Sequence, residues 1–320
     1  MTDARNKQVY LSEIADGDRV DDLFLVLRRE VKRKKDGNPY IFAILADRSG
    51  TAPCTIWGTA TCGETLLETC AALEVGRVFR ISGKVSAFNS SLQISVNEGV
   101  EYLGQPVPES TIEPADYVRM NTDIDALKRG VLDLIATIAD PTLKDVVLEA
   151  ISGADGFFEK PAAKGRHHEY PGGLAEHTLE TARIAAAGCD AIDVGSNRDL
   201  IIAGALLHDI GKAFSFERSG LCFVARPEYD LVGHVSLGVT YLERFRSRLP
   251  SEIFSHLTHI VQSHHGPHGE VACQTPEAWT VHIADYASAT LREVADDQAA
   301  LEPGSGTRTG RKCGGPVWRF

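Results

Sequence analysis

Short runs of alternating apolar and polar residues fill the N-terminal third of the chain, and this period of two is typical of half-buried β-strands. Turn-forming residues separate the runs at Asp36-Gly37-Asn38-Pro39, Arg48-Ser49-Gly50 and Asn89-Ser90-Ser91. The stretch from Thr61 to Leu73, after the third run, has helical character. The pattern predicts five strands: Leu23 to Lys34, Tyr40 to Asp47, Ala52 to Trp57, Val78 to Ala87 and Leu92 to Tyr102.

Three strands, a helix and two further strands follow one another in an order that resembles an OB-fold barrel. The stretch YIFAILADRSGTAPCTIWG is similar to the second and third strands of that fold. OB-folds bind single strands by stacking bases on aromatic side chains, while basic side chains follow the phosphate backbone. The candidates for these contacts are Arg28, Arg29, Lys32, Arg33, Lys34, Lys35, Tyr40, Phe42, Trp57 and Phe88.

Each of these candidates also has a purely structural interpretation. The basic run VKRKKDG is typical of a solvated hairpin tip, and the aromatic side chains are equally suited to a barrel core. The formal net charge of −11 opposes binding to a polyanion. Any affinity for RNA or DNA therefore has to come from a local basic patch and should fall steeply with salt.

The pattern changes from strands to helices after a segment that contains Gly104, Pro106, Pro108 and Pro114. Apolar residues then recur at spacings of three and four. The predicted helices are Asp125 to Ile138, Pro141 to Ile151, Leu174 to Cys189, Arg198 to His208, Val232 to Arg246, Ser251 to His264 and Pro276 to Asp296. We therefore expect an α+β multidomain protein with a five-stranded OB-fold barrel over residues 1–105, linker and helices over 106–160, an all-α domain over 161–298 and a C-terminal tail over 299–320.

Length and composition place the chain among soluble globular proteins. The 320 residues suit two domains, and 43% hydrophobic with 24% charged residues is close to the globular average. No apolar run approaches the roughly 18 residues of a membrane span, and the N-terminus carries acidic residues where a signal peptide is apolar. The seven cysteines form no CxxC pair. These features predict a cytoplasmic protein with reduced thiols and no membrane partner.

Histidine is confined to one part of the chain, because all 11 histidines lie between His167 and His282. The pair His208-Asp209 follows the apolar run LIIAGALL, so we expect it at the end of a buried helix. Such a pair is weak evidence alone, since a capping role also explains it. His177 lies on an amphipathic helix, and Asp285 lies on an otherwise apolar one, where a carboxylate is costly unless it is paired or bound to a cation.

The order His, His-Asp, Asp resembles the HD superfamily of metal-dependent phosphohydrolases. The resemblance implies that Asp209 bridges two ions and has a catalytic role. The first ion would be bound by His177, His208 and Asp285, and the second by His234 with His264 or His265. Which of the two adjacent histidines binds is left open. Lys212 is a catalytic candidate for contacting a phosphate oxygen, and its alternative is a solvated lysine at a turn; His256, His259, His268 and His282 lie outside the superfamily order.

The segment PAAKGRHHEYPGGLAEHTLE is similar to that of YhaM-type 3′ to 5′ exoribonucleases, in which an OB-fold also precedes the HD domain. LLHDIGK, VGHVSLG and SHHG resemble later motifs of that family. The resemblance implies a two-metal exonuclease that prefers manganese, with Fe, Ni or Zn as alternatives, and acts on single-stranded RNA or DNA. It also implies a homo-oligomer. The HH-x-Y-x-GGL pattern looks like some conjugative relaxases too, so the OB-fold decides between the two.

Substrate contacts are expected just before the first metal ligand, and the candidates are Lys164, Arg166, His167 and His168. A local structural role for these histidines is an equal alternative. A cyclic mono- or dinucleotide phosphodiesterase is the second enzymatic hypothesis, although no GYP-like sequence follows His264-His265. A non-catalytic OB-fold binding protein is the third. Trp318 and Phe320 in the tail GGPVWRF favour burial against a second copy.

Overall fold

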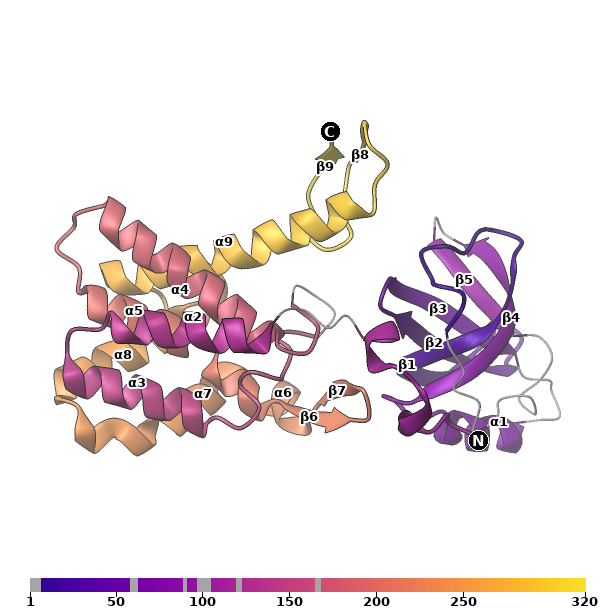
Figure 1. The fold of residues 1–320 in the computed structure, drawn as a ribbon, viewed down its shortest axis with the longest axis horizontal. Coiled ribbons are helices and arrows are strands. Elements are labelled where there is room, and N and C mark those ends of the chain that lie inside the picture. Colours follow the sequence, from indigo (N-terminus) through magenta and orange to yellow (C-terminus); the bar gives the residue numbers. More distant parts are fainter. Residues whose placement is uncertain (1–6, 58–62, 89–90, 97–104, 119–122, 165–167) are drawn as a thin grey trace. The chain divides into compact units, whose positions relative to one another are not determined.

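Five strands close into a barrel in the order β1-β2-β3-β5-β4. Figure 1 labels these strands on the ribbon. The neighbouring strands are antiparallel except for the parallel pair β3 and β5. The elements are β1 (Arg19–Arg33), β2 (Pro39–Asp47), β3 (Gly50–Trp57), α1 (Gly63–Ala72), β4 (Val78–Phe88) and β5 (Ser91–Val96). This is the predicted OB-fold order, with the single helix between the third and fourth strands, and the prediction of the barrel is confirmed.

The computed structural model describes residues 7–57, 63–88, 91–96, 105–118, 123–164 and 168–320. The chain divides into two compact units. The first contains Met1–Met120 and Arg218–Val224, and the second contains Asn121–Glu217 and Ala225–Phe320. The second half of the predicted fifth strand, Leu92 to Tyr102, lies outside the described residues.

Alternation along β2 separates the barrel core from the barrel surface. Ile41, Ala43 and Leu45 are buried, whereas Tyr40 and Phe42 are half-buried on the other face of the strand. This alternation follows from the period of two in an extended chain. Strand pairing places Lys32 opposite Tyr40 and Tyr40 opposite Trp57, which forms one row across three strands.

A short hairpin from the later part of the chain belongs to the barrel unit. It is formed by β6 (Phe216–Ser219) and β7 (Cys222–Ala225), and its residues Arg218–Val224 lie in that unit. The Leu221 N–H donates to the Gly76 carbonyl at 2.9 Å. Gly76 has φ +86°, and a Cβ there would lie 1.7 Å from the Ser219 carbonyl oxygen. Only glycine therefore fits at this contact.

The second unit is built around α5 (Arg198–Leu207), in which every residue from Leu200 to Leu207 is buried. Helix α5 contacts α2, α3, α4, α8 and α9. The helices are α2 (Ile124–Ala136), α3 (Pro141–Gly153), α4 (Gly173–Ala191), α6 (Pro227–Leu231), α7 (His234–Leu242), α8 (Ser251–Ser263) and α9 (Pro276–Ala299). The prediction of a helical second domain is confirmed, and the β6-β7 hairpin is an addition to it.

The helix starts of this unit have a local cause in the sequence. Asp123, Asp140, Asn197 and Thr275 each accept a hydrogen bond from the backbone N–H three residues ahead. Short polar side chains at this position satisfy one of the N–H groups that a helix start leaves without a partner. None of the described helices has the length and apolar character that crossing a membrane requires.

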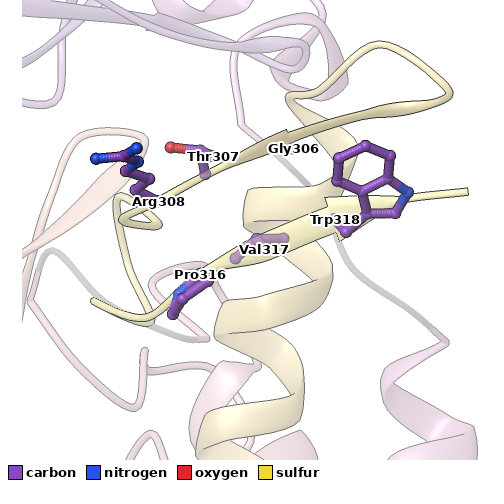
Figure 2. Close-up of a pocket in the computed structure, with 6 residues that line it drawn as sticks. All are labelled: Gly306, Thr307, Arg308, Pro316, Val317 and Trp318. Carbon is purple, nitrogen blue, oxygen red and sulfur yellow. The ribbon is translucent and has the colours of Figure 1, made fainter.

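The C-terminal segment is folded, in place of the expected tail. Strands β8 (Ser305–Thr307) and β9 (Val317–Arg319) pair beyond the end of α9. The Asp297 carboxylate accepts backbone N–H groups of Arg311, Lys312 and Cys313, each at about 3 Å. A pocket of about 320 Å³ lies on this hairpin, lined by Gly306, Thr307, Arg308, Pro316, Val317 and Trp318 (Figure 2). Its described lining contains no carboxylate or imidazole side chain.

Candidate metal centre

The side chains predicted to bind metal come from the elements packed around the C-terminal end of α5. His208 directly follows α5, and His177 lies in the second turn of α4. Asp285 lies in the middle of α9. His234 is the first residue of α7, and His264 directly follows α8. Four helices therefore position ligands around the last turn of the central helix.

The first group of candidate ligands consists of His177, His208 and Asp285. The two histidine Nε2 atoms are 3.3 Å apart. Asp285 Oδ1 lies 3.0 Å from His177 Nε2 and 3.9 Å from His208 Nε2. Both imidazoles are fully buried. Two nitrogen atoms and one carboxylate oxygen thus point to one small volume, as a transition-metal site requires.

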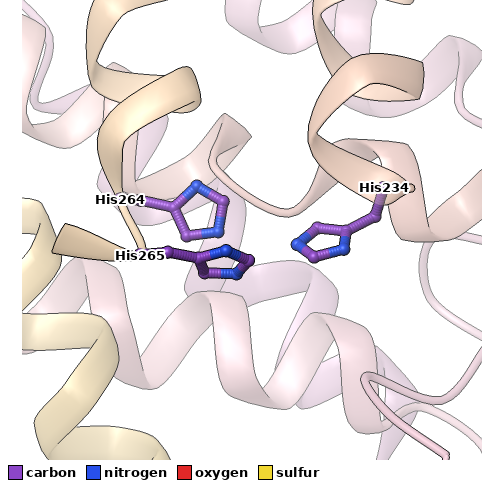
Figure 3. A group of neighbouring side chains, drawn as sticks. All are labelled: His234, His264 and His265. Carbon is purple, nitrogen blue, oxygen red and sulfur yellow. The ribbon is translucent and has the colours of Figure 1, made fainter. Parts of the chain in front are cut away.

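The second group consists of His234, His264 and His265, which converge from two elements in Figure 3. The ring centroids of His234 and His265 are 5.0 Å apart, and those of His264 and His265 are 4.2 Å apart. One nitrogen from each of the three rings lies within 4.8 Å of the others. The structure therefore brings both adjacent histidines, His264 and His265, to this group.

Asp209 lies between the two groups and presents one carboxylate oxygen to each. Its Oδ2 atom is 3.4 Å from His177 Nε2 and 3.3 Å from His208 Nε2. Its Oδ1 atom is 3.3 Å from His234 Nε2 and 3.7 Å from His264 Nε2. A carboxylate with this orientation has the geometry of a bridging ligand.

Helix ends select which ring nitrogen faces the centre in two of the histidines. His208 Nδ1 donates to the Ala205 carbonyl and His264 Nδ1 donates to the Val261 carbonyl, both at 2.7 Å. The last carbonyls of a helix have no N–H partner within it and are free to accept these bonds. The Nδ1 proton leaves the Nε2 lone pair available for a cation.

Three buried polar atoms at the centre fit a cation. His234 Nε2, His264 Nε2 and Asp209 Oδ1 have no hydrogen-bond partner among the described residues. A buried polar atom without a partner costs roughly 1–3 kcal/mol, and these three atoms all belong to the second group or its bridge. A bound divalent cation satisfies all of them together. The residues present therefore fit the metal that an HD-type site requires.

The protonation states differ between the two groups. Burial acts to lower the pKa of His177, but the carboxylates of Asp209 and Asp285 outweigh it and raise the pKa to about 9. Burial lowers the pKa of His234 to about 3 and lowers that of His264 well below its usual value. Burial opposes ionisation of Asp209, but Lys212 and His208 outweigh it and hold its pKa low. The second group is thus neutral at pH 7, whereas His177 carries a proton that a metal has to displace.

Lys212 lies against the bridging carboxylate, with Nζ 2.5 Å from Asp209 Oδ2. Its side chain is 12% exposed, so it is not a freely solvated lysine at a turn.

Gly211 precedes Lys212, and a Cβ at that position would lie 1.9 Å from the His234 carbonyl oxygen. Glycine therefore permits the close approach that brings Asp209 and His234 together.

The candidate substrate contacts before α4 separate into different environments. Lys164 is exposed, with Nζ 5.9 Å from the centre of the Tyr229 ring. Arg166 and His167 lie outside the described residues. His168 is 2% exposed, and its Nε2 lies 3.2 Å from a Glu180 carboxylate oxygen. His168 is therefore enclosed beside His177, and its contact with a substrate stays a prediction.

Residues that the sequence analysis did not single out surround His177 on its other side. Ser288 Oγ lies 3.0 Å from His177 Nδ1, and Arg292 Nε donates to Glu180 at 2.9 Å. His168, Glu176 and Glu180 form a third group of possible ligands, but the Arg292 guanidinium already binds both glutamates. The signal was present as helical spacing, since Glu180 is three residues after His177 and Ser288 is three after Asp285.

Three of the four histidines outside the superfamily order, His256, His259 and His282, have structural side-chain contacts. His256 Nε2 lies 2.9 Å from Thr275 Oγ1, at the start of α9. His259 Nε2 accepts the Gln274 N–H at 3.1 Å. His282 Nδ1 donates to the His264 carbonyl at 2.8 Å, which supports the backbone of a candidate ligand.

Aromatic and basic side chains gather on the outer face of the barrel. The rings of Tyr40 and Trp57 have centroids 5.2 Å apart, and Lys34 Nζ lies 5.2 Å from the centre of the Trp57 ring. Lys32 Nζ lies 4.0 Å from the centre of the Phe42 ring. All three aromatic rings are half-buried, so they are surface groups and not barrel core.

Three further candidates, Arg33, Lys35 and Phe88, lie at or just beyond the ends of barrel strands. Arg33 donates to the Gly37 carbonyl at 3.1 Å and is exposed, as is Lys35. Phe88 ends β4, and its side chain lies outside the described part of the structure. We call the surface built from Tyr40, Phe42 and Trp57, with Lys32 and Lys34, the barrel aromatic face.

Comparison with known proteins matches both units. Residues 174–290 match the HD domain, and residues 26–101 match the OB-fold nucleic acid binding domain. The 3′-5′ exoribonuclease YhaM of Bacillus subtilis is 26% identical over 310 residues, covering 94% of each chain. YhaM of Listeria monocytogenes is 26% identical over 280 residues, covering 84% of this chain and 85% of the relative.

A third relative matches only part of the chain. The dihydroneopterin 2′,3′-cyclic phosphate phosphodiesterase of Methanocaldococcus jannaschii is 38% identical over 141 residues, covering 43% of this chain and 54% of the relative. The predicted resemblance to proteins that join an OB-fold to an HD domain is confirmed by these matches. An HD domain implies dependence on a divalent metal, which agrees with the two histidine groups.

Proposed function

We propose that this chain, a homologue of the YhaM 3′-5′ exoribonucleases with an OB-fold and an HD domain, is a metal-dependent 3′-5′ exonuclease of single-stranded RNA. Single-stranded DNA is the alternative polymer. The observation that carries the proposal is the position of Asp209, which presents one oxygen to each of two histidine groups. This arrangement suits phosphodiester hydrolysis, in which charge develops on two oxygens of the same phosphorus.

We assign the metal ligands in two sets. His177, His208 and Asp285 would hold one ion, His234, His264 and His265 a second, and Asp209 both. When bound, such ions supply Lewis-acid stabilisation to the attacking and leaving oxygens. Imidazole and carboxylate donors suit manganese, and iron, nickel and zinc are alternatives.

The chain's own residues prepare the site for the anionic substrate. Asp209 and Asp285 are ionised, and Lys212 balances part of this charge through its contact with Asp209 Oδ2. When Asp209 is bound to metal, the Lys212 ammonium would contact a phosphate oxygen. Burial of His208 and His264 excludes water from their Nε2 atoms and keeps both rings in one orientation.

The barrel aromatic face would hold the single strand during hydrolysis. Its three half-buried rings offer surfaces on which bases stack, and Lys32 and Lys34 offer positive charge for the phosphates. Stacking of this kind does not depend on base identity. We therefore expect little sequence preference.

A ladder assay tests the proposed activity. A single-stranded RNA labelled at its 5′ end, incubated with the protein and Mn²⁺, should give labelled products that shorten progressively. Labelled RNA that stays intact while Mn²⁺, Fe²⁺, Ni²⁺ and Zn²⁺ are titrated would refute it. A 5′-labelled DNA of the same sequence in parallel decides between the two polymers.

A cyclic-phosphate phosphodiesterase is the second candidate function. The 38% identity to the Methanocaldococcus relative favours it, because that match is closer than the match to YhaM although it covers less of the chain. The OB-fold favours the polymer, since a small cyclic nucleotide has no need of an extended binding face. Faster turnover of cyclic mono- or dinucleotides than of an oligonucleotide would reverse the order of the two candidates.

We further propose a cytoplasmic homo-oligomer. The described cysteines are free thiols, as a reducing compartment requires. Trp318 is 52% and Phe320 is 99% exposed, and α9 also exposes Ile283 and Leu291. Exposed apolar groups of this size favour burial against a second copy. Deleting residues 314–320 should lower the mass measured by light scattering, and a monomer both before and after deletion would contradict the proposal.

A further inference from the structure

Three polar side chains form a chain of contacts behind His177, on the side of the ring opposite Nε2. Ser288 Oγ lies 3.0 Å from His177 Nδ1 and donates to Glu180 Oε2 at 2.8 Å. Arg292 Nε donates to the other Glu180 oxygen at 2.9 Å. His177 is fully buried and Ser288 is 3% exposed, so bulk water does not compete for these bonds.

The direction of the hydrogen bonds follows from the number of protons. Burial acts to raise the pKa of Glu180, but His168 and Arg292 outweigh it and lower the pKa to about 2, so the side chain is a carboxylate and only accepts. Ser288 has one hydroxyl proton, which goes to Glu180. The serine oxygen is then left with lone pairs only. The Nδ1 atom of His177 has to donate to it, so the proton that a metal displaces is the one on Nε2, which faces Asp209 and Asp285.

His177 needs this support because of its place in α4. His208 and His264 each donate Nδ1–H to a free carbonyl at the end of their own helix. His177 lies in the second turn of a 19-residue helix, where the backbone carbonyls accept bonds from the following turn. For His177, the acceptor of the Nδ1–H hydrogen bond therefore has to come from another helix.

We propose that Ser288 is a positioning residue that fixes the Nδ1–H form and the orientation of His177, with Glu180 and Arg292 holding the serine hydroxyl in place. The proposal rests on the metal centre assigned above. It also gives His168 a place behind that centre, since its Nε2 lies 3.2 Å from Glu180 Oε2 and its ring centroid 5.3 Å from that of His177. Outer contacts of this kind tune the affinity of a site without touching the metal.

Ser288→Ala tests the proposal in the full-length protein. Mn²⁺ binding, measured from the electron paramagnetic resonance signal of the free ion, should weaken about 10- to 100-fold. Ser288→Thr keeps the hydroxyl and should restore most of the affinity. Thr181→Val is the matched control, because it removes a buried hydroxyl of α4 that has no partner among the described residues. Its affinity should stay within about twofold of the wild type.

A second measurement reports on the imidazole itself. In Zn²⁺-loaded protein with ¹⁵N-labelled histidine, the His177 Nδ1–H signal, assigned by its loss in His177→Gln, should exchange with water faster in Ser288→Ala. An unchanged signal or an affinity within about twofold of the wild type overturns the proposal. Wild-type protein that binds no Mn²⁺ refutes the metal centre instead. If Ser288→Ala does not fold, Glu180→Gln replaces it, because the amide can donate to the serine oxygen and disturb the same bond.

Discussion

The metal centre and the barrel aromatic face differ in how firmly their side chains are held. At the centre, His177, His208, Asp209 and His264 are at most 1% exposed, and each has a hydrogen bond that fixes its orientation. On the barrel, Tyr40, Phe42 and Trp57 are half-buried; Lys34 contacts the Trp57 ring, and Lys32 contacts the Phe42 ring and pairs with Glu30 at 2.9 Å. Catalysis requires reacting groups to keep their positions closely, whereas a base can stack on an aromatic ring in many positions. Substitutions at the metal centre should therefore lower the rate of hydrolysis, and substitutions on the barrel aromatic face should lower the affinity for a single strand.

The largest expected effect is that of Asp209→Ala. Without this carboxylate neither histidine group retains its shared ligand, so the substitution should lower the rate of hydrolysis on the order of 10³-fold or more. Binding of a single strand to the barrel, measured by fluorescence anisotropy, should remain within about threefold. A folded Asp209→Ala protein that cleaves within about tenfold of the wild type would mean that the active site lies elsewhere. Lys212→Ala should cost less, since it leaves every metal ligand in place.

The second effect is the dependence of metal affinity on pH. His177 has a pKa of about 9 instead of 6.5 because its proton is shared with two carboxylates. A metal binds only the neutral ring, so affinity should rise about tenfold per pH unit as pH increases toward about 9 and then level off. His234 and His264, with lowered pKa values, are already neutral and add no such slope. Calorimetric titration with Mn²⁺ from about pH 6.5 to about pH 8.5 checks this, and a flat profile would contradict it.

A smaller effect is expected for Trp57→Ala on the barrel. Loss of one stacking surface is worth about 1–3 kcal/mol, which weakens strand binding roughly 5- to 150-fold. The rate at saturating RNA should not change, because the metal centre lies in a different unit. Trp279→Ala, at an exposed tryptophan of α9, is the matched control and should bind RNA as the wild type does. Equal losses of RNA affinity in Trp57→Ala and Trp279→Ala would show that the barrel aromatic face does not bind the strand.

The smallest effect is expected for Lys34→Gln. This lysine supplies one positive charge beside Trp57, so its loss should weaken binding a few-fold at low salt. The plot of log affinity against log salt concentration should become shallower by about 0.7, as for one phosphate contact to a single strand. An unchanged slope would indicate that Lys34 only packs on the tryptophan ring. Comparing Lys34→Gln with Trp57→Ala separates the contribution of charge from that of stacking on the barrel aromatic face.

Several features of the site depended on distant parts of the chain. The sequence identified His168 as a candidate substrate contact, but packing against Glu180 places it in the interior. The hairpin at residues 218–224 joined the barrel unit through Gly76, a contact between segments more than a hundred positions apart. The expected tail folded because one buried carboxylate, Asp297, accepts three backbone N–H groups. A local sequence pattern does not predict contacts between such distant segments.

By itself the sequence determined the order of the barrel strands, the helical second domain and which imidazole and carboxylate side chains are candidates for binding metal. Those properties are local: strand and helix periods repeat within a few residues, and imidazole and carboxylate groups carry their donor atoms wherever they lie. Only the tertiary structure decided that Asp209 presents Oδ2 to one histidine group and Oδ1 to the other, and that Ser288 Oγ lies beside His177 Nδ1. The reason is that the direction in which a metal-binding side chain points depends on which helices pack together. That packing brings together residues that are far apart in the chain, beyond the reach of any local period.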